Sequence, residues 1–456
     1  MLLAEPADKP NAGEESGAAD IAATRAVPWA AIARAFMTAK ASLGIGENDS
    51  PKGSNWQALA LPRFRWYFAG SVVSNFGTWL QNTAQVVLAY QLTRSVFWVG
   101  VVTCAQFTSP LLIGPWAGVL TNRLGSWRVL IATQCASLVI AGTLAVLQFT
   151  GQLGKLWLII GAVGIGVAFT FALPALSVTV PALVPPGQTK KALAMDSVSY
   201  NLGRALAPML GVLVLATAGS GLAFALNAAS FGFFTGVLLC LRPREAQAGA
   251  NRSRVMNGIR IAWRDRRIMV LLLMVAAVTV AADPILVLGP ALAHSFGESA
   301  DWSGVFITAL GAGNVIGSLR PSGQQASIRR AASALCILSI AMMVFVMAHV
   351  IWLSVAAAVV AGMACLLAGA TLKALLLHHA GSGVGRQAAV MAAWAVAWAG
   401  SKPIASFADG ILAGPLGVRG TGLLLALPAL VPAFVLVLCP AFGKRFVRHT
   451  AFDLAS

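Results

Sequence analysis

The sequence predicts an all-α membrane protein in which twelve transmembrane helices form two six-helix halves. Three observations carry this prediction: 58% of the 456 residues are hydrophobic, only 10% are charged, and the mean hydropathy is +0.79. Soluble domains carry about 25% charged residues, so most of the surface of this chain must face lipid. An ordinary soluble globular protein is therefore excluded.

Twelve apolar runs follow Phe64, and each is near the roughly 20 residues that a membrane-spanning helix needs. Charged or Gly- and Pro-rich breaks separate the runs. In chain order, the predicted spans are 66–92, 98–121, 128–149, 156–180, 192–217, 221–241, 268–293, 302–319, 332–350, 352–376, 388–413 and 420–442.

The breaks between the runs alternate between strongly basic and nearly uncharged. One set contains most of the lysines and arginines that follow Phe64, whereas the other set contains Arg94, Lys155 and Arg419. Because cytoplasmic loops carry the excess of basic residues, the basic set is expected to face the cytoplasm. We therefore expect a multi-pass protein of the inner (plasma) membrane with both termini in the cytoplasm.

The longest internal break is also the most basic, and it divides the chain in two. We expect a flexible cytoplasmic extension at 1–61, a first half at 62–241, a basic cytoplasmic linker at 242–267, a second half at 268–443 and a cytoplasmic tail at 444–456. The end of the linker mixes apolar and basic residues, which predicts contact with anionic membrane lipid. Shifting the sequence by 195 residues places Pro208 on Pro403. A duplicated chain of this kind favours a transporter with its substrate site between the halves.

The loop after the second predicted span carries the most specific motif. Its residues, Gly118-Val-Leu-Thr-Asn-Arg-Leu-Gly125-Ser-Trp-Arg128, resemble the signature G-x-L-x-D-R-x-G-x-x-R of the major facilitator superfamily. The segments 64–81 and 196–208 are similar to its enterobactin-exporter-like branch, the transmembrane secretion effectors. This resemblance implies a conformational role for the loop residues Gly118, Asn122, Arg123, Gly125 and Arg128. Asn122 replaces the family's Asp and cannot make a charge-assisted contact, so the latch is expected to be weaker.

A second motif lies in the fifth predicted span. Gly203, Pro208 and Gly211 resemble the Gly-Pro-x-x-Gly antiporter signature, although Ala207 replaces its first glycine. Proline bends a helix and glycine allows another helix to approach closely. We expect these residues, together with Pro403, to bend or pack helices, and simple helix packing is the alternative to a role in efflux.

Six ionisable residues lie within the predicted spans, where charge is costly and usually functional. Three of them, Asp196, Lys373 and Asp409, fall near span ends, where headgroups or water are within reach, and are expected to be structural or gating groups.

The other three, Arg204, Asp283 and Lys402, fall near the bilayer centre. The resemblance places their helices around the interface between the halves, where we expect them to meet. One cation would then attract an anionic or zwitterionic substrate, and Asp283 would carry a proton; a salt bridge that holds the halves together is the alternative. Pro284 follows Asp283 and predicts a helix break there.

Polar and aromatic side chains complete the predicted substrate and proton pathway. A polar stripe in the first span is compatible with a lumen, and an aromatic pair in the eleventh span shares one helix face, suited to stacking on a flat ligand or to core packing. The pathway residues in addition to the three central charges are Asn75, Trp79, Gln81, Gln106, Asn201, Trp394 and Trp398.

Several function classes are not supported by any motif. The sequence lacks a G-x-x-x-x-G-K-S/T motif, and its histidines and six cysteines show no metal-ligand spacing, so we expect no cofactor, no metal and no enzyme activity. The net charge of +17 belongs to cytoplasmic loops and does not indicate nucleic-acid binding.

The sequence thus predicts a secondary active transporter, and the resemblance implies proton-coupled export of a small amphipathic molecule, siderophore-like or drug-like, by alternating access. The expected partners are that substrate, protons and membrane lipid, and the chain is expected to be a monomer. Two alternatives stay open: proton-coupled uptake of an organic anion, and a scaffold or flippase-like protein whose charges only bridge helices.

Overall fold

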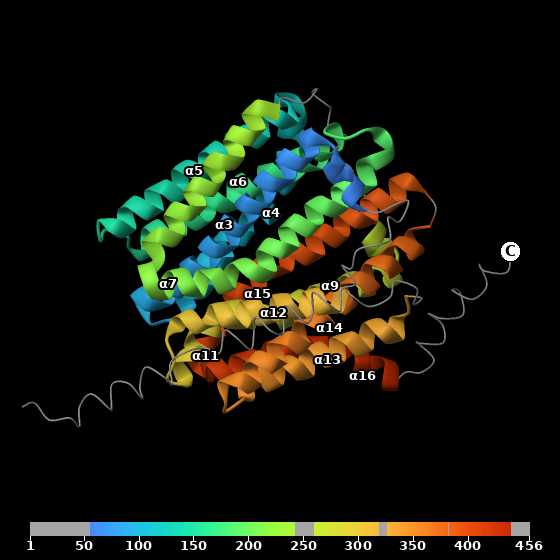
Figure 1. The fold of residues 1–456 in the computed structure, drawn as a ribbon. Helices are drawn as coiled ribbons and strands as arrows, with labels where there is room; N and C mark the ends of the chain where they lie inside the picture. The colour runs from blue at the N-terminus through green and yellow to red at the C-terminus, as the bar shows by residue number, and fades with distance from the viewer. Residues whose placement is uncertain (1–54, 242–259, 319–325, 382, 439–456) are drawn as a thin grey trace, which may run out of the picture. The chain divides into compact units, whose positions relative to one another are not determined.

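The computed structural model describes residues 55–241, 260–318, 326–381 and 383–438, and all regular elements in these ranges are helical (Figure 1). Most of the predicted extension 1–61, most of the linker 242–267 and the tail 444–456 lie outside the described residues. Residues 55–60 of the predicted flexible extension are an exception, because they form a 3₁₀ helix whose Ala58 is fully buried against α3 and α7.

Before residue 242, long helices follow one another with short connections. They are η1 (Asn55–Ala60), α3 (Pro62–Thr93), α4 (Val96–Leu124), α5 (Ser126–Phe149), α6 (Lys155–Ala182), η2 (Pro186–Gln188) and α7 (Thr189–Leu241). Within α7 the backbone turns at Gly219, where φ is 75° and ψ is 178°, so two helices meet at one residue. Glycine adopts this positive φ without the steric cost that a side chain brings.

After residue 260, the helices differ widely in length. The elements are α9 (Arg266–Ala282), α10 (Pro284–Val287), α11 (Gly289–Ser295), η3 (Ala300–Trp302), α12 (Ser303–Ser318), α13 (Ile328–Met347), α14 (Ile351–Ala380), α15 (Val384–Ala426), η4 (Leu427–Ala429) and α16 (Val431–Leu438). A second glycine turn, at Gly417, divides α15. The end of α9 before Asp283 and Pro284 confirms the predicted helix break.

Within the described residues, eight helices are long and apolar enough to cross a membrane. Two of them, Thr189–Leu241 and Gly385–Ala429, contain a glycine turn. The predicted spans 66–92 and 302–319 fall on α3 and α12, which are not among the eight. The reason is that α3 carries several amides and that α12 has only 16 residues.

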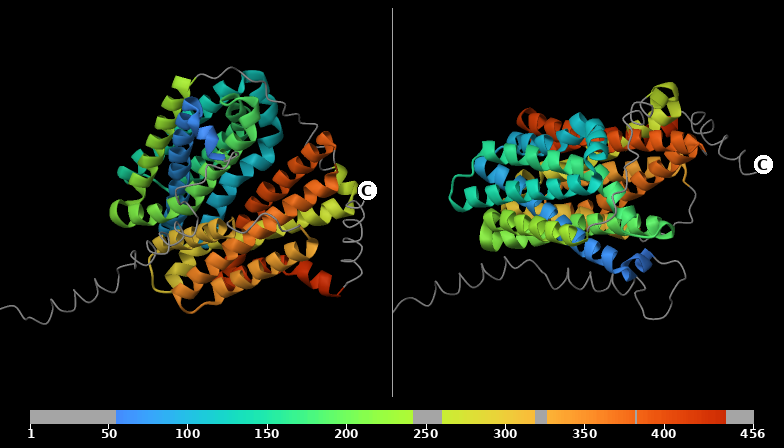
Figure 2. Two further views of the ribbon diagram at one scale, coloured as in Figure 1. Left: turned by 45° about the vertical axis from the view of Figure 1, so that its right-hand side comes forward. Right: turned by 90° about the horizontal axis from the view of Figure 1, so that it is seen from above.

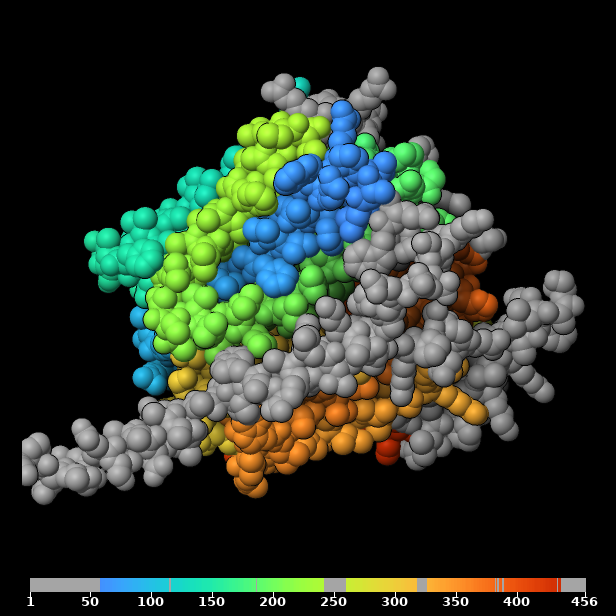
Figure 3. All heavy atoms as spheres, in the orientation of Figure 1, coloured from blue at the N-terminus to red at the C-terminus, as the bar shows by residue number. Residues whose placement is uncertain are grey.

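The helices before residue 242 pack mainly on one another. In the space-filling view, α3 lies between the two parts of α7, and α5 and α6 complete this group (Figure 3). Among the later helices, α14 packs on α12 and α13, and α9 packs on α15. Large buried side chains such as Phe224 and Phe345 fill these contacts.

Two helix pairs make most of the contacts between the earlier helices and the later ones: α4 with α15, and α7 with α12 (Figures 1 and 2). Both pairs come together at small residues. A Cβ added at Gly100 of α4 would lie 2.9 Å from Gly410 Cα of α15, and one added at Gly311 of α12 would lie 2.5 Å from Ala205 Cα of α7. Such backbone-to-backbone approach is typical of helix association in membranes.

We expect Gly100→Ala to destabilise the protein by about 1–3 kcal/mol, because overpacking forces backbone to move. The new Cβ would lie 2.5 Å from the Ser406 carbonyl oxygen, which cannot rotate away. Unfolding of the purified protein in detergent measures the change. Gly114→Ala on the same helix is the control, since no atom lies within 4 Å of its added Cβ. Equal stability of the two variants would contradict the close crossing.

Candidate functional site

One face of α15 carries the candidate site. Trp394, Trp398, Lys402 and Ser406 follow at intervals of four residues, and Asp409 comes three residues later. Residues at these spacings lie above one another on a helix. The apolar helix α15 therefore presents two stacked indoles, a cation, a hydroxyl and an acid along one line.

Asp283 meets this face from α9. It is 4% exposed, and the Ser406 hydroxyl donates a hydrogen bond to its Oδ2. The position depends on the helix break, since Pro284 has no N–H to continue α9. The Asp283 carbonyl begins the next short helix by accepting from Leu286 at 2.8 Å and from Val287 at 3.3 Å. One turn earlier, the Thr279 hydroxyl donates to the Trp398 carbonyl at 3.3 Å and joins the two helices.

The two central cations both lie over aromatic rings. Lys402 Nζ is 4.1 Å from the centroid of the Phe107 ring of α4, and Arg204 Cζ is 5.6 Å from that of Trp79. Such cation–π contacts offset part of the cost of placing a charge in an apolar environment.

The structure brings the charges of Arg204, Asp283 and Lys402 into one neighbourhood. Lys402 interacts electrostatically with both other residues. Among the described residues, however, no ion pair within 4.0 Å joins any two of them. The cations are thus balanced by an acid at longer range and remain available to a third, anionic group.

The prediction that Asp409 reaches headgroups or water is wrong. Its side chain is fully buried, and neither carboxylate oxygen has a hydrogen-bond partner within the described part of the chain. The next residue, Gly410, lies at the α4–α15 crossing, where Phe97 and Gly100 pack on it. Of the other two peripheral charges, Asp196 accepts a 2.8 Å hydrogen bond from Tyr67, and Lys373 is exposed 5.1 Å from the Trp394 ring.

The polar stripe of α3 mainly joins helices. Asn227 of α7 donates to Gln81 Oε1 at 2.7 Å, and Gln81 is 1% exposed. Asn75 donates to the Ser199 hydroxyl of α7 at 2.9 Å. Gln81 therefore lies between α3 and α7, and its part in a pathway stays a prediction.

The remaining amides differ in their environments. Gln106 of α4 donates to Asn82 of α3 at 2.9 Å, whereas the exposed Asn201 donates to the Ser197 carbonyl of its own helix at 2.8 Å.

The aromatic residues form two clusters. Trp394 and Trp398 stack with ring centroids 5.9 Å apart and an interplanar angle of 22°, as their spacing predicts. Trp79 is largely buried, packs edge-on against Tyr200 at 5.9 Å, and its indole N–H has no partner among the described residues. Flat surfaces thus lie next to both central cations.

The family-like loop forms a tight connection between two helices. Gly118, Asn122 and Arg123 lie in the last turns of α4, and Arg128 lies in the first turn of α5. Gly125 joins the helices with φ 87°, a conformation that favours glycine. The local sequence thus explains the turn, while the role of the loop as a latch stays a prediction.

The helix-packing residues of α7 contact α3. A Cβ at Gly203 would lie 2.9 Å from the Asn75 backbone, and one at Gly211 would lie 3.4 Å from Thr83 Cβ. Close approach at Gly203 is therefore confirmed. Pro208 and Pro403 both lie inside helices, α7 and α15 respectively, and the backbone of each helix departs from helical geometry only at its glycine turn.

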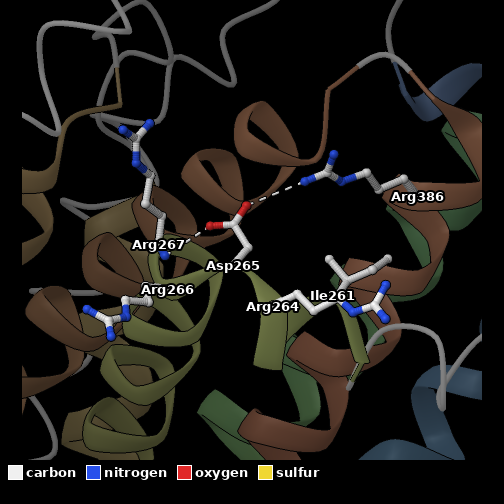
Figure 4. Close-up of a pocket in the computed structure, with 6 residues that line it drawn as sticks. All are labelled: Ile261, Arg264, Asp265, Arg266, Arg267 and Arg386. Carbon is white, nitrogen blue, oxygen red and sulfur yellow. Dashed lines mark hydrogen bonds and ion pairs between the residues drawn. The ribbon is translucent and has the colours of Figure 1, made fainter.

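A basic cavity of about 540 Å³ lies beside the start of α9 (Figure 4). Asp265 caps α9 by accepting from the Arg267 backbone N–H at 3.0 Å, and its other carboxylate oxygen lies 3.4 Å from Arg386 Nη2 of α15. The lining residues are Ile261, Arg264, Asp265, Arg266, Arg267 and Arg386.

A second, apolar groove of about 490 Å³ lies between α4 and α15. Its residues Ile404 and Phe407 are exposed on the outside of the helix pair. The complete lining is Cys104, Thr108, Leu111, Pro403, Ile404, Phe407, Ala408, Ile411 and Leu412.

Sequence reasoning missed three site residues. Ser406 had a signal, since it follows Lys402 by four residues. Phe107 and Asn227 had none, because their partners are far away in the sequence. No group of three or more His, Cys, Asp or Glu residues that could hold a metal occurs in the described ranges.

Comparisons with known proteins point to one family of transporters. A family model described as transmembrane secretion effector matches residues 53–444. The Staphyloferrin A transporter of Staphylococcus aureus (strain NCTC 8325 / PS 47) is 23% identical over 178 residues, which are 39% of this chain and 44% of that protein. The chain thus matches less than half the length of this curated relative.

Solved structures of transporters share the fold. A bacterial homologue of the human lysosomal transporter Spinster, inward-facing and unoccupied, has a TM-score of 0.63 at 12% identity and covers 85% of this chain and 98% of its own. A mutant of the nucleoside transporter NupG has a TM-score of 0.65 at 12% identity, and the match covers 82% of this chain and 99% of that protein. The human organic anion transporter MFSD10 has a TM-score of 0.56 at 14% identity, and the match covers 82% of this chain and 99% of that protein.

We expect Gln81→Leu to lower the free energy of unfolding by about 1–3 kcal/mol, because it leaves the buried Asn227 amide without its acceptor. Unfolding in detergent measures the loss. Asn201→Leu, which removes an exposed bond within one helix, should cost less. A Gln81→Leu variant as stable as the unmodified chain would show that the amide pair contributes nothing.

We expect Asp265→Ala to cost about 1 kcal/mol, chiefly through loss of the α9 cap. The ion pair with Arg386 adds little, since its side chains are 50% and 32% exposed and solvent screens them. Asp265→Asn keeps a capping oxygen and loses the charge, so it should be closer to the unmodified chain in the same unfolding assay. The reverse order would assign the larger effect to the ion pair.

Proposed function

Because this chain belongs to the transmembrane secretion effector family of major facilitator transporters, we propose that it exports a small amphipathic molecule in exchange for protons, by alternating access. Both the family and the structurally similar proteins are transporters, which agrees with a non-enzymatic role. Membrane transport is the shared activity; the substrate, the direction and the coupling to protons are what we propose.

The observation that carries the proposal is the cluster of Arg204, Lys402 and Asp283 on three different helices. Each cation lies over an aromatic ring, with no ion pair within 4.0 Å joining these three residues. A site with two cations and flat aromatic surfaces suits a ligand that is anionic at one end and apolar at the other.

Siderophore-like compounds belong to this chemical class, and the name of the Staphyloferrin A transporter supports the assignment. In the proposed mechanism, Arg204 and Lys402 bind the anionic group of the substrate. Trp79, Trp394 and Trp398 provide stacking surfaces, and Gln106 and Asn201 provide hydrogen bonds.

Asp283 is the proposed proton carrier of the central cluster. When ionised, it balances Lys402 and accepts from Ser406; a bound proton cancels that negative charge. In the proposed exchange, Asp283 binds its proton from outside and releases it inside, and the substrate is carried outward on the other half of the cycle.

We propose twelve spans in two six-helix halves. The helices of the structure support this number. Gly219 and Gly417 divide α7 and α15 into two spans each, and α3 and α12 are added to the remaining long helices. The α4–α15 and α7–α12 pairs are then the contacts between halves that alternate during transport. Asn122 in place of the family's Asp weakens the proposed latch.

The proposed location is the inner membrane, with both termini cytoplasmic and the chain a monomer. Contact with membrane lipid is supported by residues 260–264, which are helical and include Trp263 at 77% exposure. The preceding part of the proposed linker lies outside the described residues.

The test compares cells that express the unmodified chain, Asp283→Asn or an empty vector. We expect one compound to accumulate outside the cells only when they express the unmodified chain. With Asp283→Asn, the amount outside should equal that of the empty vector, although the variant inserts normally into the membrane. Asp196→Asn is the control, since Asp196 accepts its hydrogen bond from Tyr67 and not from a residue of the central cluster.

Three outcomes would contradict the proposal. Accumulation inside the cells would indicate proton-coupled uptake of an organic anion. Identical profiles for all chains would favour a scaffold or flippase-like role. Unchanged pH-driven export by Asp283→Asn would remove Asp283 from the coupling.

A further inference from the structure

Asp409 is a second buried acid beside the central cluster, and the exchange mechanism above does not use it. We propose that Asp409 is a proton-binding residue that holds its proton in this conformation and exchanges it with Asp283. Proton binding by Asp409 stands on the structure alone, whereas its use in transport rests on the proposed proton-coupled export.

The first step is the burial of Asp409. The side chain is fully buried, and both carboxylate oxygens lack a hydrogen-bond donor within the described residues. An ionised carboxylate in an apolar environment is stable only with donors or a counter-charge. The neutral carboxylic acid is therefore the form that this site accommodates.

The second step is the charge around Asp409. Asp283 is the group whose charge acts on it, and that charge is also negative. Lys402, two turns away on the same helix, interacts with Asp283 and with Arg204. Two neighbouring acids whose negative charges repel each other favour a state with a single proton between them.

The elements packed on α15 add no cation next to Asp409. At the crossing, α4 contributes Phe97 and Gly100, and α10 contributes uncharged residues. The other titratable groups on elements packed against α15 are Cys104, Arg123, Arg266, Arg267, His294, Arg329, Arg330, Cys336, Cys365, Lys373, His378 and His379, and the interaction that acts on Asp409 comes from Asp283.

The third step is the hydrogen bond at Asp283. Ser406, one turn before Asp409 on the same face, donates to Asp283 Oδ2, which is the arrangement for an ionised Asp283. A hydroxyl both donates and accepts. When the proton leaves the Asp409 carboxyl and binds the Asp283 carboxylate, the Ser406 hydroxyl turns from donor to acceptor, and the total charge of the pair is unchanged.

The test is infrared difference spectroscopy of the purified full chain in lipid nanodiscs at acidic and alkaline pH. A buried protonated carboxyl gives a C=O stretching band that is distinct from that of a carboxylate. We expect this band at neutral pH in the unmodified chain and in Asp196→Asn, and its loss in Asp409→Asn. Asp283→Asn should retain the band but lose it at a lower pH than the unmodified chain, because the neighbouring negative charge is gone.

Two results would overturn the proposal. A band of unchanged intensity in Asp409→Asn would mean that the protonated carboxyl belongs to another residue. A band that disappears at the same pH in Asp283→Asn and in the unmodified chain would mean that the charge of Asp283 does not act on Asp409. Since asparagine matches the shape of a neutral acid, Asp409→Asn should unfold at the same temperature as the unmodified chain. A much lower unfolding temperature of the variant would instead indicate an ionised Asp409. The spectroscopic test does not require transport. The proposal for Asp409 can therefore fail while proton-coupled export is observed, and export can fail while Asp409 is found to be protonated.

Discussion

The constraint on which the structure depends is that lipid offers no hydrogen bonds. Every polar group inside the membrane must therefore find its partner within the chain. The long helices satisfy their own backbones, and the few polar side chains connect one helix to another. The Gln81–Asn227 pair and the Tyr67–Asp196 bond are examples, both between α3 and α7.

The central cluster is where this constraint is relaxed. Lys402 and Arg204 rest on aromatic rings and are balanced by a single hydrogen-bonded acid. Opposite charges that are farther apart than in an ion pair stabilise each other less than a salt bridge does. They can also change partners more easily. Charge that can change partners is what the proposed transport cycle requires at this site.

The sequence was most informative where the cause is local. The break at Asp283 follows from Pro284, the turn at Gly125 follows from a glycine between two helices, and the stacked Trp394 and Trp398 follow from their spacing. The position of a residue along its predicted span gave its depth in the membrane. The sequence did not give the side of the helix on which its side chain lies. Asp409 was therefore placed within reach of water, although its side chain is fully buried. The amides of α3 were expected to share one environment, but they contact different helices.

The glycine turns have a consequence for the surface on which they lie. At Gly219 and Gly417, two helices meet at a single residue, and only Arg94 and Ser95 separate α3 from α4. Connections this short leave almost no chain beyond the ends of the helices. On the side that these turns face, proteases and antibodies would find few extended segments to bind, and an inserted epitope tag would have to separate two packed helices. Insertions for detection or labelling therefore belong at the chain termini and not at these turns.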